Sequence, residues 1–203
     1  NRGSISVFKK LYPNLIYDTK KYLLNEISKI NSPRALNFLI QLMDSEKNRK
    51  LITNIEWAIY NLSTKKKIST IIKNFDDKNK NTQYRLLNIL SDFHDKRCKE
   101  HFQKVYTVST HDHLKLVSIN LLRPYTDKLS VLFVQDVYNS TNDENIKLAC
   151  VRTLLNQPRV HSKKFFSELV SKKDISENTI LLMIKYIQNS KSKSNKEEYQ
   201  KFI

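Results

Sequence analysis

The sequence predicts an all-α protein, an α-solenoid of about six antiparallel helix pairs, and three observations predict it. The 203 residues include one glycine, Gly3, and four prolines, whereas sandwiches, barrels and doubly wound α/β folds need glycines for turns with positive φ and for phosphate loops. A column of aliphatic residues recurs at a nearly constant step. A second set of amphipathic segments lies half a period before each member of that column.

The aliphatic column lies in segments that share one apolar helical signature. The segments are 22–27, 54–62, 84–90, 114–122, 146–154 and 179–187. When they are aligned, the column consists of Ile27, Ile59, Ile89, Ile119, Val151 and Ile184. Successive members are 30 to 33 residues apart. A fixed period of this length is typical of repeat architectures, in which each unit buries its apolar face against its neighbours. The column therefore predicts the second helix of each pair.

The first helix of each pair is predicted by the shorter amphipathic segments. These cover 5–12, 33–43, 65–75, 96–107, 128–138 and 162–171. In the second of them Leu36, Leu39 and Leu42 lie on one helix face. Polar turns with Asp, Ser and Asn follow at 44–47, 76–80, 109–112, 140–143 and 172–174, and such side chains cap helices. We expect one solenoid over 1–190 and a polar tail or linker over 191–203.

A family resemblance is carried by residues 143–154, Asp-Glu-Asn-Ile-Lys-Leu-Ala-Cys-Val-Arg-Thr-Leu. This segment resembles the second half of a HEAT repeat, a family of armadillo-like superhelices, and the resemblance extends over about 20–190. It implies that the basic residue of each unit pairs with a turn aspartate; the candidates are Arg85, Lys115 and Lys147 with Asp112 and Asp143. Because most units lack the first-helix proline of the family, an armadillo-like or another irregular helical array stays open.

The resemblance implies a non-catalytic scaffold or adaptor domain that binds another protein. In such stacks the second helices line the concave surface, so the residues after the column are candidates for the contact. Those with polar or cationic side chains are Tyr60, Asn120, Arg152 and Lys185. We expect them to form a partner-binding ridge.

The net charge of +16 supports a rival function. It favours an anionic partner, either nucleic acid or an acidic membrane surface. The candidate basic edge consists of Lys65, Lys66, Lys67, Lys163 and Lys164. However, the excess is mostly lysine, whereas arginine is preferred for bidentate phosphate contacts. A solvated, composition-driven surface is therefore the favoured interpretation of the charge.

No residue pattern predicts catalysis, and we expect no cofactor, metal or small-molecule substrate. The cluster His111-Asp112-His113 lacks the further ligands of a zinc site, and we interpret it as a polar turn in which Asp112 caps the next helix. Trp57 aligns with apolar residues of the other repeats, so we expect it in the core. Cys150 lies in an apolar run, which predicts a buried thiol.

Two cysteines in 203 residues do not form a disulfide framework, which favours a reducing compartment and a cytoplasmic location. No stretch reaches the length of a membrane span. Because the sequence begins with Asn1, a membrane anchor upstream of this residue is the alternative, and the chain would then be the cytoplasmic domain of an anchored protein.

Overall fold

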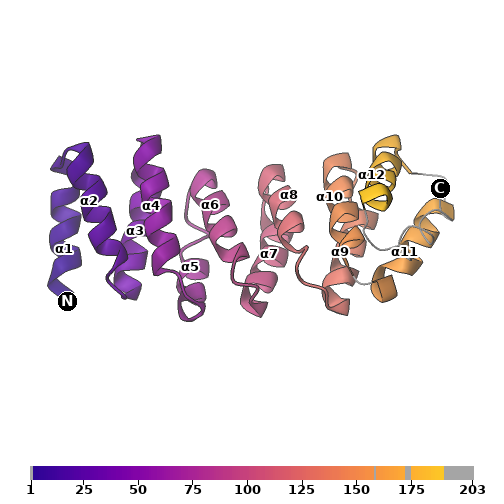
Figure 1. Cartoon of the computed structure of the whole chain (residues 1–203), viewed down its shortest axis with the longest axis horizontal. Helices are drawn as coiled ribbons and strands as arrows, with labels where there is room; N and C mark the ends of the chain where they lie inside the picture. Colours follow the sequence, from indigo (N-terminus) through magenta and orange to yellow (C-terminus); the bar gives the residue numbers. More distant parts are fainter. Residues whose placement is uncertain (1, 158, 172–174, 190–203) are drawn as a thin grey trace. The chain divides into compact units, whose positions relative to one another are not determined.

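The computed structural model describes residues 2–157, 159–171 and 175–189, and all regular structure in these ranges is helical (Figure 1). The α-helices are α1 (Arg2–Leu11), α2 (Tyr17–Ser28), α3 (Pro33–Ser45), α4 (Arg49–Leu62), α5 (Ile68–Lys73), α6 (Lys80–Ser91), α7 (Lys96–Val108), α8 (Asp112–Leu121), α9 (Lys128–Ser140), α10 (Glu144–Leu155), α11 (Arg159–Ser171) and α12 (Glu177–Asn189). Two short 3-10 helices are η1 (Tyr12–Asn14) and η2 (Lys65–Lys67). The predicted all-α class is confirmed.

The helices match the predicted segments in order and in place. The aliphatic column lies on α2, α4, α6, α8, α10 and α12, and the shorter segments correspond to α1, α3, η2 with α5, α7, α9 and α11. The tail predicted for 191–203 and the turn predicted for 172–174 lie outside the described residues.

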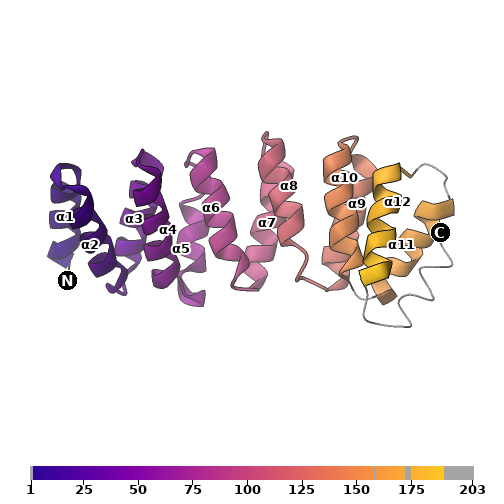
Figure 2. The same cartoon turned by 45° about the horizontal axis from the view of Figure 1, so that its top comes forward.

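Contacts divide the chain into two compact units, Asn1–His101 and Phe102–Ile203, and each is described by itself. In the first unit α3 packs against α4, α1 and α5 each lie beside α3, and α2 lies beside α4. Figures 1 and 2 both show α2, α4 and α6 following one another in that order. In the second unit α10 contacts α8, α9 and α12, and α11 contacts α9. Second helices thus pack against one another in the pairs α2 with α4, α8 with α10 and α10 with α12, whereas α6 packs mainly against α3 and α5.

The aliphatic column forms the centre of the core. Ile27, Ile59, Ile89, Ile119 and Val151 are all buried, and Ile184 is half-buried. Burial of each such side chain contributes about 1.5–3 kcal/mol relative to exposure, because apolar surface is removed from water. The positions that the sequence repeat predicted to lie in the core are therefore the positions that the structure buries.

The two cysteines are also buried. Burial raises the pKa of the Cys98 thiol to about 11 and that of the Cys150 thiol to about 12, because the thiolate loses its hydration. Both thiols are therefore protonated at neutral pH. The predicted burial of Cys150 is confirmed.

Polar residues before several helices cap their first turns. The side chains of Ser32, Asn48, Asn79, Asp127 and Asp143 each accept a hydrogen bond from a backbone N–H of the helix that follows. Such a cap is worth about 1 kcal/mol, because it satisfies an N–H group that has no partner within the helix.

The prediction that Asp112 caps α8 is wrong. The residue that precedes this helix is His111, and its side chain makes no capping hydrogen bond. Asp112 lies instead in the first turn of α8. Its negative charge is favourable there, because the amino end of a helix carries partial positive charge.

One pair of residues joins neighbouring helix pairs in the first unit. The backbone N–H of Asn79 donates to Oδ1 of Asp44 at 2.8 Å, and Nδ2 of Asn79 donates to the carbonyl of Asp44 at 2.9 Å. Because Asn79 also caps α6, it fixes the start of α6 against the end of α3.

Candidate functional site

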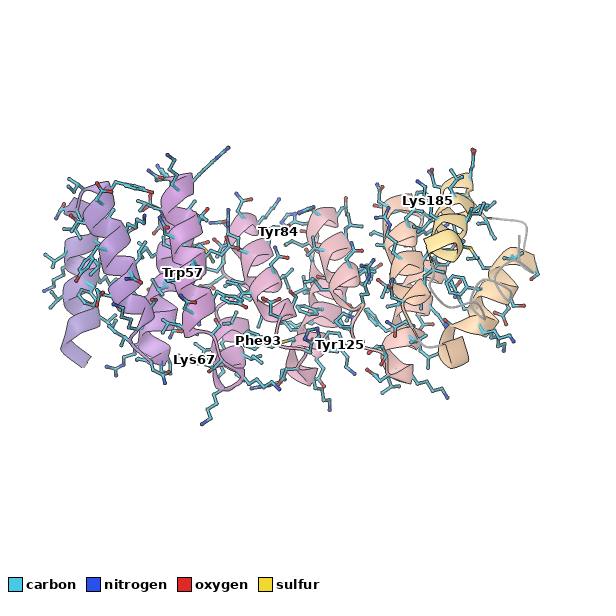
Figure 3. All side chains as sticks on the ribbon, viewed as in Figure 1. Trp57, Lys67, Tyr84, Phe93, Tyr125 and Lys185 are labelled. Atoms are coloured by element: carbon cyan, nitrogen blue, oxygen red, sulfur yellow. The ribbon has the colours of Figure 1, made fainter. Side chains whose placement is uncertain are left out.

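Trp57 on α4 is 54% exposed, so the prediction that it packs in the core is wrong (Figure 3). The buried side of α4 is formed by Leu51, Ile55, Ala58, Ile59 and Leu62. Trp57 follows Ile55 by two residues, which is about 200° around a helix of 3.6 residues per turn. The indole therefore lies on the outer side of α4, away from α3.

Three adjoining hollows surround this part of α4. The α2–α4 hollow, of about 580 Å³, is lined by Asp18, Lys21, Tyr22, Leu24, Asn25, Thr53, Asn54 and Trp57. The amino-end hollow, of about 700 Å³, lies between α4 and α6 and is lined by Met43, Glu46, Lys47, Arg49, Ile52, Thr53, Asn79, Asn81, Thr82, Tyr84 and Arg85. The carboxyl-end hollow, of about 310 Å³, is lined by Thr53, Glu56, Trp57, Tyr60, Asn88, Ile89 and Asp92.

Thr53 lines all three hollows, and Trp57 lines two of them. The hollows therefore form one continuous surface across α2, α4 and α6, which we call the α4 face. Large aromatic side chains are exposed on each part of it, namely Tyr22, Trp57, Tyr60 and Tyr84. Contiguous exposed aromatic surface is characteristic of interaction sites, because burying it on binding is favourable and such rings lose little conformational entropy.

The formal charges that line the α4 face cancel. Four acidic residues (Asp18, Glu46, Glu56 and Asp92) and four basic residues (Lys21, Lys47, Arg49 and Arg85) line the three hollows. Residues 1–101 as a whole contain twenty Lys and Arg but only ten Asp and Glu. The positive excess of this unit therefore lies outside the hollows, and the α4 face does not resemble a surface that follows a phosphate backbone.

An ion pair joins Arg85 of α6 to Glu56 of α4. Both side chains are about 30% exposed (31% and 28%), so water still reaches the pair. The resemblance to HEAT repeats implied a turn aspartate as the partner of Arg85. The structure places Glu56 there instead, because the two side chains face each other across the groove between parallel second helices.

The carboxylate of Glu46 is held at the edge of the amino-end hollow. It accepts hydrogen bonds from the backbone N–H groups of Lys47 and Asn48, both at 2.9 Å, and from the hydroxyl of Tyr12 at 3.1 Å. Burial opposes ionisation of Glu46, but these hydrogen bonds outweigh it and hold its pKa below the ordinary value. The lone pairs of this carboxylate are thus engaged within the protein.

Three residues of the predicted partner-binding ridge are exposed, and the fourth is half-buried. Tyr60 is exposed and lines the carboxyl-end hollow beside Trp57. Arg152 and Lys185 are exposed on α10 and α12 of the second unit, where Figure 3 labels Lys185. Asn120 is half-buried, and its Nδ2 donates to the carbonyl of Leu116 at 3.0 Å. Only Tyr60 belongs to the α4 face.

The predicted basic edge is exposed at four of its five positions. Lys65, Lys66, Lys163 and Lys164 are exposed, but Lys67 is buried, and the prediction for Lys67 is wrong. Successive side chains of a 3-10 helix point about 120° apart, so one residue of η2 must turn inward. Its Nζ donates to the carbonyl of Leu62 at 2.7 Å, at the end of α4, and burial lowers the pKa of Lys67.

The residues that the structure describes contain no group of three or more His, Cys, Asp and Glu side chains that could hold a metal ion. Within the same ranges, no helix has both the length and the apolar character needed to cross a membrane.

The sequence contained part of the signal for the α4 face. Tyr60 was predicted from its register, one residue after the column. The exposure of Trp57, Tyr22 and Tyr84 was missed, because alignment of the repeats says which positions are equivalent but not how far a neighbouring helix covers each of them.

No protein-family model matches the chain, and no curated protein sequence matches it with significant similarity.

Proposed function

We propose that the chain is a non-catalytic scaffold or adaptor domain of HEAT-like helix pairs, and that it binds another protein through the α4 face. The observation that carries the proposal is the position of Trp57. Its ring is half exposed and lies between two hollows that contain further exposed aromatic rings. Tryptophan is one of the residue types, with tyrosine and arginine, that are enriched among the residues contributing most of the binding energy near the centre of protein interfaces.

The balance of charge on the α4 face favours a protein partner over a polyanion. A nucleic acid would bring a continuous row of phosphates past Asp18, Glu56 and Asp92, and this juxtaposition of like charge is costly. A polypeptide can instead present apolar side chains to the hollows. The hollows are also large enough for such side chains, at about 310 to 700 Å³ each.

Two observations support a solenoid of HEAT-like units as the scaffold. The aliphatic column repeats every 30 to 33 residues and is buried at five of six positions. The second helices α2 and α4 lie beside each other, as α10 does beside α8 and α12, and the first helix α3 lies beside α1 and α5, as α9 does beside α11. Stacking of this kind leaves one face of each second helix uncovered, and the α4 face is such a surface.

The proposal is tested with peptides displayed in a random library and selected on the full chain. The enriched peptides are then measured against Trp57→Ala. We expect binding to weaken by about thirtyfold or more, since a central tryptophan contributes about 2 kcal/mol or more. Ile16→Ala is the matched control, because Ile16 is exposed in the same unit but lines none of the three hollows. Equal binding by Trp57→Ala and wild type would overturn the proposal.

A second candidate function rests on the exposed lysines. Lys65 and Lys66 are exposed, and the positive excess of residues 1–101 lies outside the α4 face. We propose nucleic-acid binding through these lysines as the alternative. A mobility-shift series at increasing salt tests it, because binding by counterion release falls steeply with salt. No shift at the lowest salt concentration would remove this candidate.

A further inference from the structure

The charges on the α4 face are separated along the helices. The amino-end hollow is lined by three basic residues and one acidic residue, Lys47, Arg49, Arg85 and Glu46, whereas the charged residues of the carboxyl-end hollow are Glu56 and Asp92. The ends of α4 add to this separation, since a helix carries partial positive charge at its amino end and partial negative charge at its carboxyl end. The face therefore has a positive and a negative end, and Trp57 lines the hollow at the negative end.

Two cations in the amino-end hollow remain available to a ligand. Arg85 is paired with Glu56, and the carboxylate of Glu46 is engaged by Tyr12 and by two backbone N–H groups. Lys47 and Arg49 are both exposed, and neither forms an ion pair with any residue that the structure describes. A carboxylate placed in this hollow would meet two unpaired cations, whose attraction exceeds the repulsion from the single charge of Glu46.

We propose that the partner is a protein segment with an acidic residue for this hollow and a large apolar or aromatic residue for Trp57. This inference rests on the proposed function and specifies the partner's chemistry. The acidic side chain lies between Lys47 and Arg49, and the apolar side chain packs against the indole. An acidic residue on the opposite side of the apolar anchor is disfavoured, because it would face Asp92.

The spacing of the two anchor residues follows from α4. Arg49 and Trp57 are eight residues apart on this helix, which is about 12 Å at 1.5 Å per residue. An extended polypeptide covers about 3.3–3.6 Å per residue. An extended partner therefore places its acidic residue three or four positions from the apolar one. The positive excess of residues 1–101 accelerates the encounter with such a segment, since opposite charges attract at long range.

The test uses a displayed library of random twelve-residue peptides, selected on the full wild-type chain and depleted on Trp57→Ala. We expect the surviving peptides to share Asp or Glu three or four positions from Trp, Phe, Tyr or Leu. Replacing that Glu with Gln in a synthetic peptide should weaken binding about fivefold, the effect of losing one solvent-accessible charge pair.

A charge exchange on the protein tests the assignment of the hollow. Selection on Arg49→Glu should change the preferred acidic residue to Lys or Arg at the same spacing. Selection on Lys50→Glu is the matched control and should keep the acidic preference, because Lys50 is exposed next to Arg49 but lines none of the hollows.

The outcomes separate this inference from the proposed function. Peptides that depend on Trp57 but carry no acidic residue at this spacing would overturn the inference and leave the proposed function standing. An acidic preference that Arg49→Glu does not alter would overturn it as well. If no selected peptide depends on Trp57, both the inference and the proposed function are wrong.

Discussion

Substitution of Asp95 by Asn should destabilise the first unit in a pH-dependent way. Oδ1 of Asp95 accepts hydrogen bonds from the backbone N–H and the Nε of Arg97, both at 2.9 Å, and Oδ2 accepts from Nη2 at 3.0 Å. Arg97 also donates to the carbonyl of Lys65 at 2.7 Å and to Oγ of Ser69 at 3.2 Å. The carboxylate thus orients an arginine that joins the start of α7 to η2 and α5.

The magnitude follows from the pKa of Asp95. Hydrogen bonds from Arg97 lower this pKa from the ordinary 3.8 to about 2. At 1.36 kcal/mol per pKa unit, the difference corresponds to about 2.4 kcal/mol. The side chain of Arg97 is 40% exposed, so solvent screening reduces the contribution of the pair to about 1 kcal/mol.

The sign of the pH dependence follows from the lowered pKa. Since the folded protein holds the carboxylate ionised more strongly than the unfolded chain does, its contribution is fully present above pH 3.8. It is lost as the pH falls from 3.8 to about 2. Asp95→Asn keeps an oxygen acceptor for the backbone N–H of Arg97 and removes the charge. It should therefore lower the free energy of unfolding at pH 7 by about 1 kcal/mol and have progressively less effect below pH 4.

Urea unfolding at several pH values measures this effect. Fluorescence of Trp57, the one tryptophan of the chain, reports on the unit that contains Asp95. Asp77→Asn is the control, because the side chain of Asp77 is 73% exposed and pairs only with the adjacent Lys78 among the described residues. It should leave the urea midpoint unchanged. If Asp95→Asn has no effect at pH 7, or the same effect at pH 7 and near pH 2, the assigned role of the carboxylate is wrong.

Three further predictions concern the core and the helix ends. Asn79→Ala should lower the free energy of unfolding by about 1–2 kcal/mol in the same urea assay, because α6 loses its cap and the carbonyl of Asp44 loses its donor; an unchanged midpoint would contradict this. Ile59→Ala should cost about 2–5 kcal/mol, since the side chain is fully buried and its removal leaves a cavity; a cost below 1 kcal/mol would show that the site is not packed as described. Cys98 and Cys150 should react with a disulfide reagent at pH 8 only after unfolding, because both are buried and burial raises their pKa; a rapidly reacting thiol in the native protein would refute this.

The helices could be predicted because their signals are local. Residues 30 to 33 apart, such as Ile59 and Ile89, occupy equivalent helical positions, and burial of one helix side follows from the 3.6-residue period. Capping by Asn and Asp before a helix depends on residues two or three positions away. Scarcity of glycine excluded most other fold classes. None of these inferences needs knowledge of which helices are neighbours.

The α4 face depends on neighbours that the sequence does not specify. Trp57 and Leu87 occupy equivalent repeat positions, yet Trp57 is exposed and Leu87 is fully buried. Lys67 was expected beside Lys65 and Lys66 on a basic edge, but the short turn of η2 directs it to a carbonyl at the end of α4. Each outcome is set by the rotation of a helix and by the side chains packed around it.

The all-α class, the repeat period and the buried column follow from the sequence alone, as do the caps Asn79 and Asp143, which lie in predicted polar turns. The tertiary structure decided which side chains meet across the helices, as Glu56 meets Arg85 from 29 residues away and Asp44 meets Asn79 from 35. It also decided that aromatic rings from α2, α4 and α6 line adjoining hollows around Thr53. The physical reason is that a helix forms from interactions within a few residues, whereas a binding surface forms from the packing of helices that are distant in sequence.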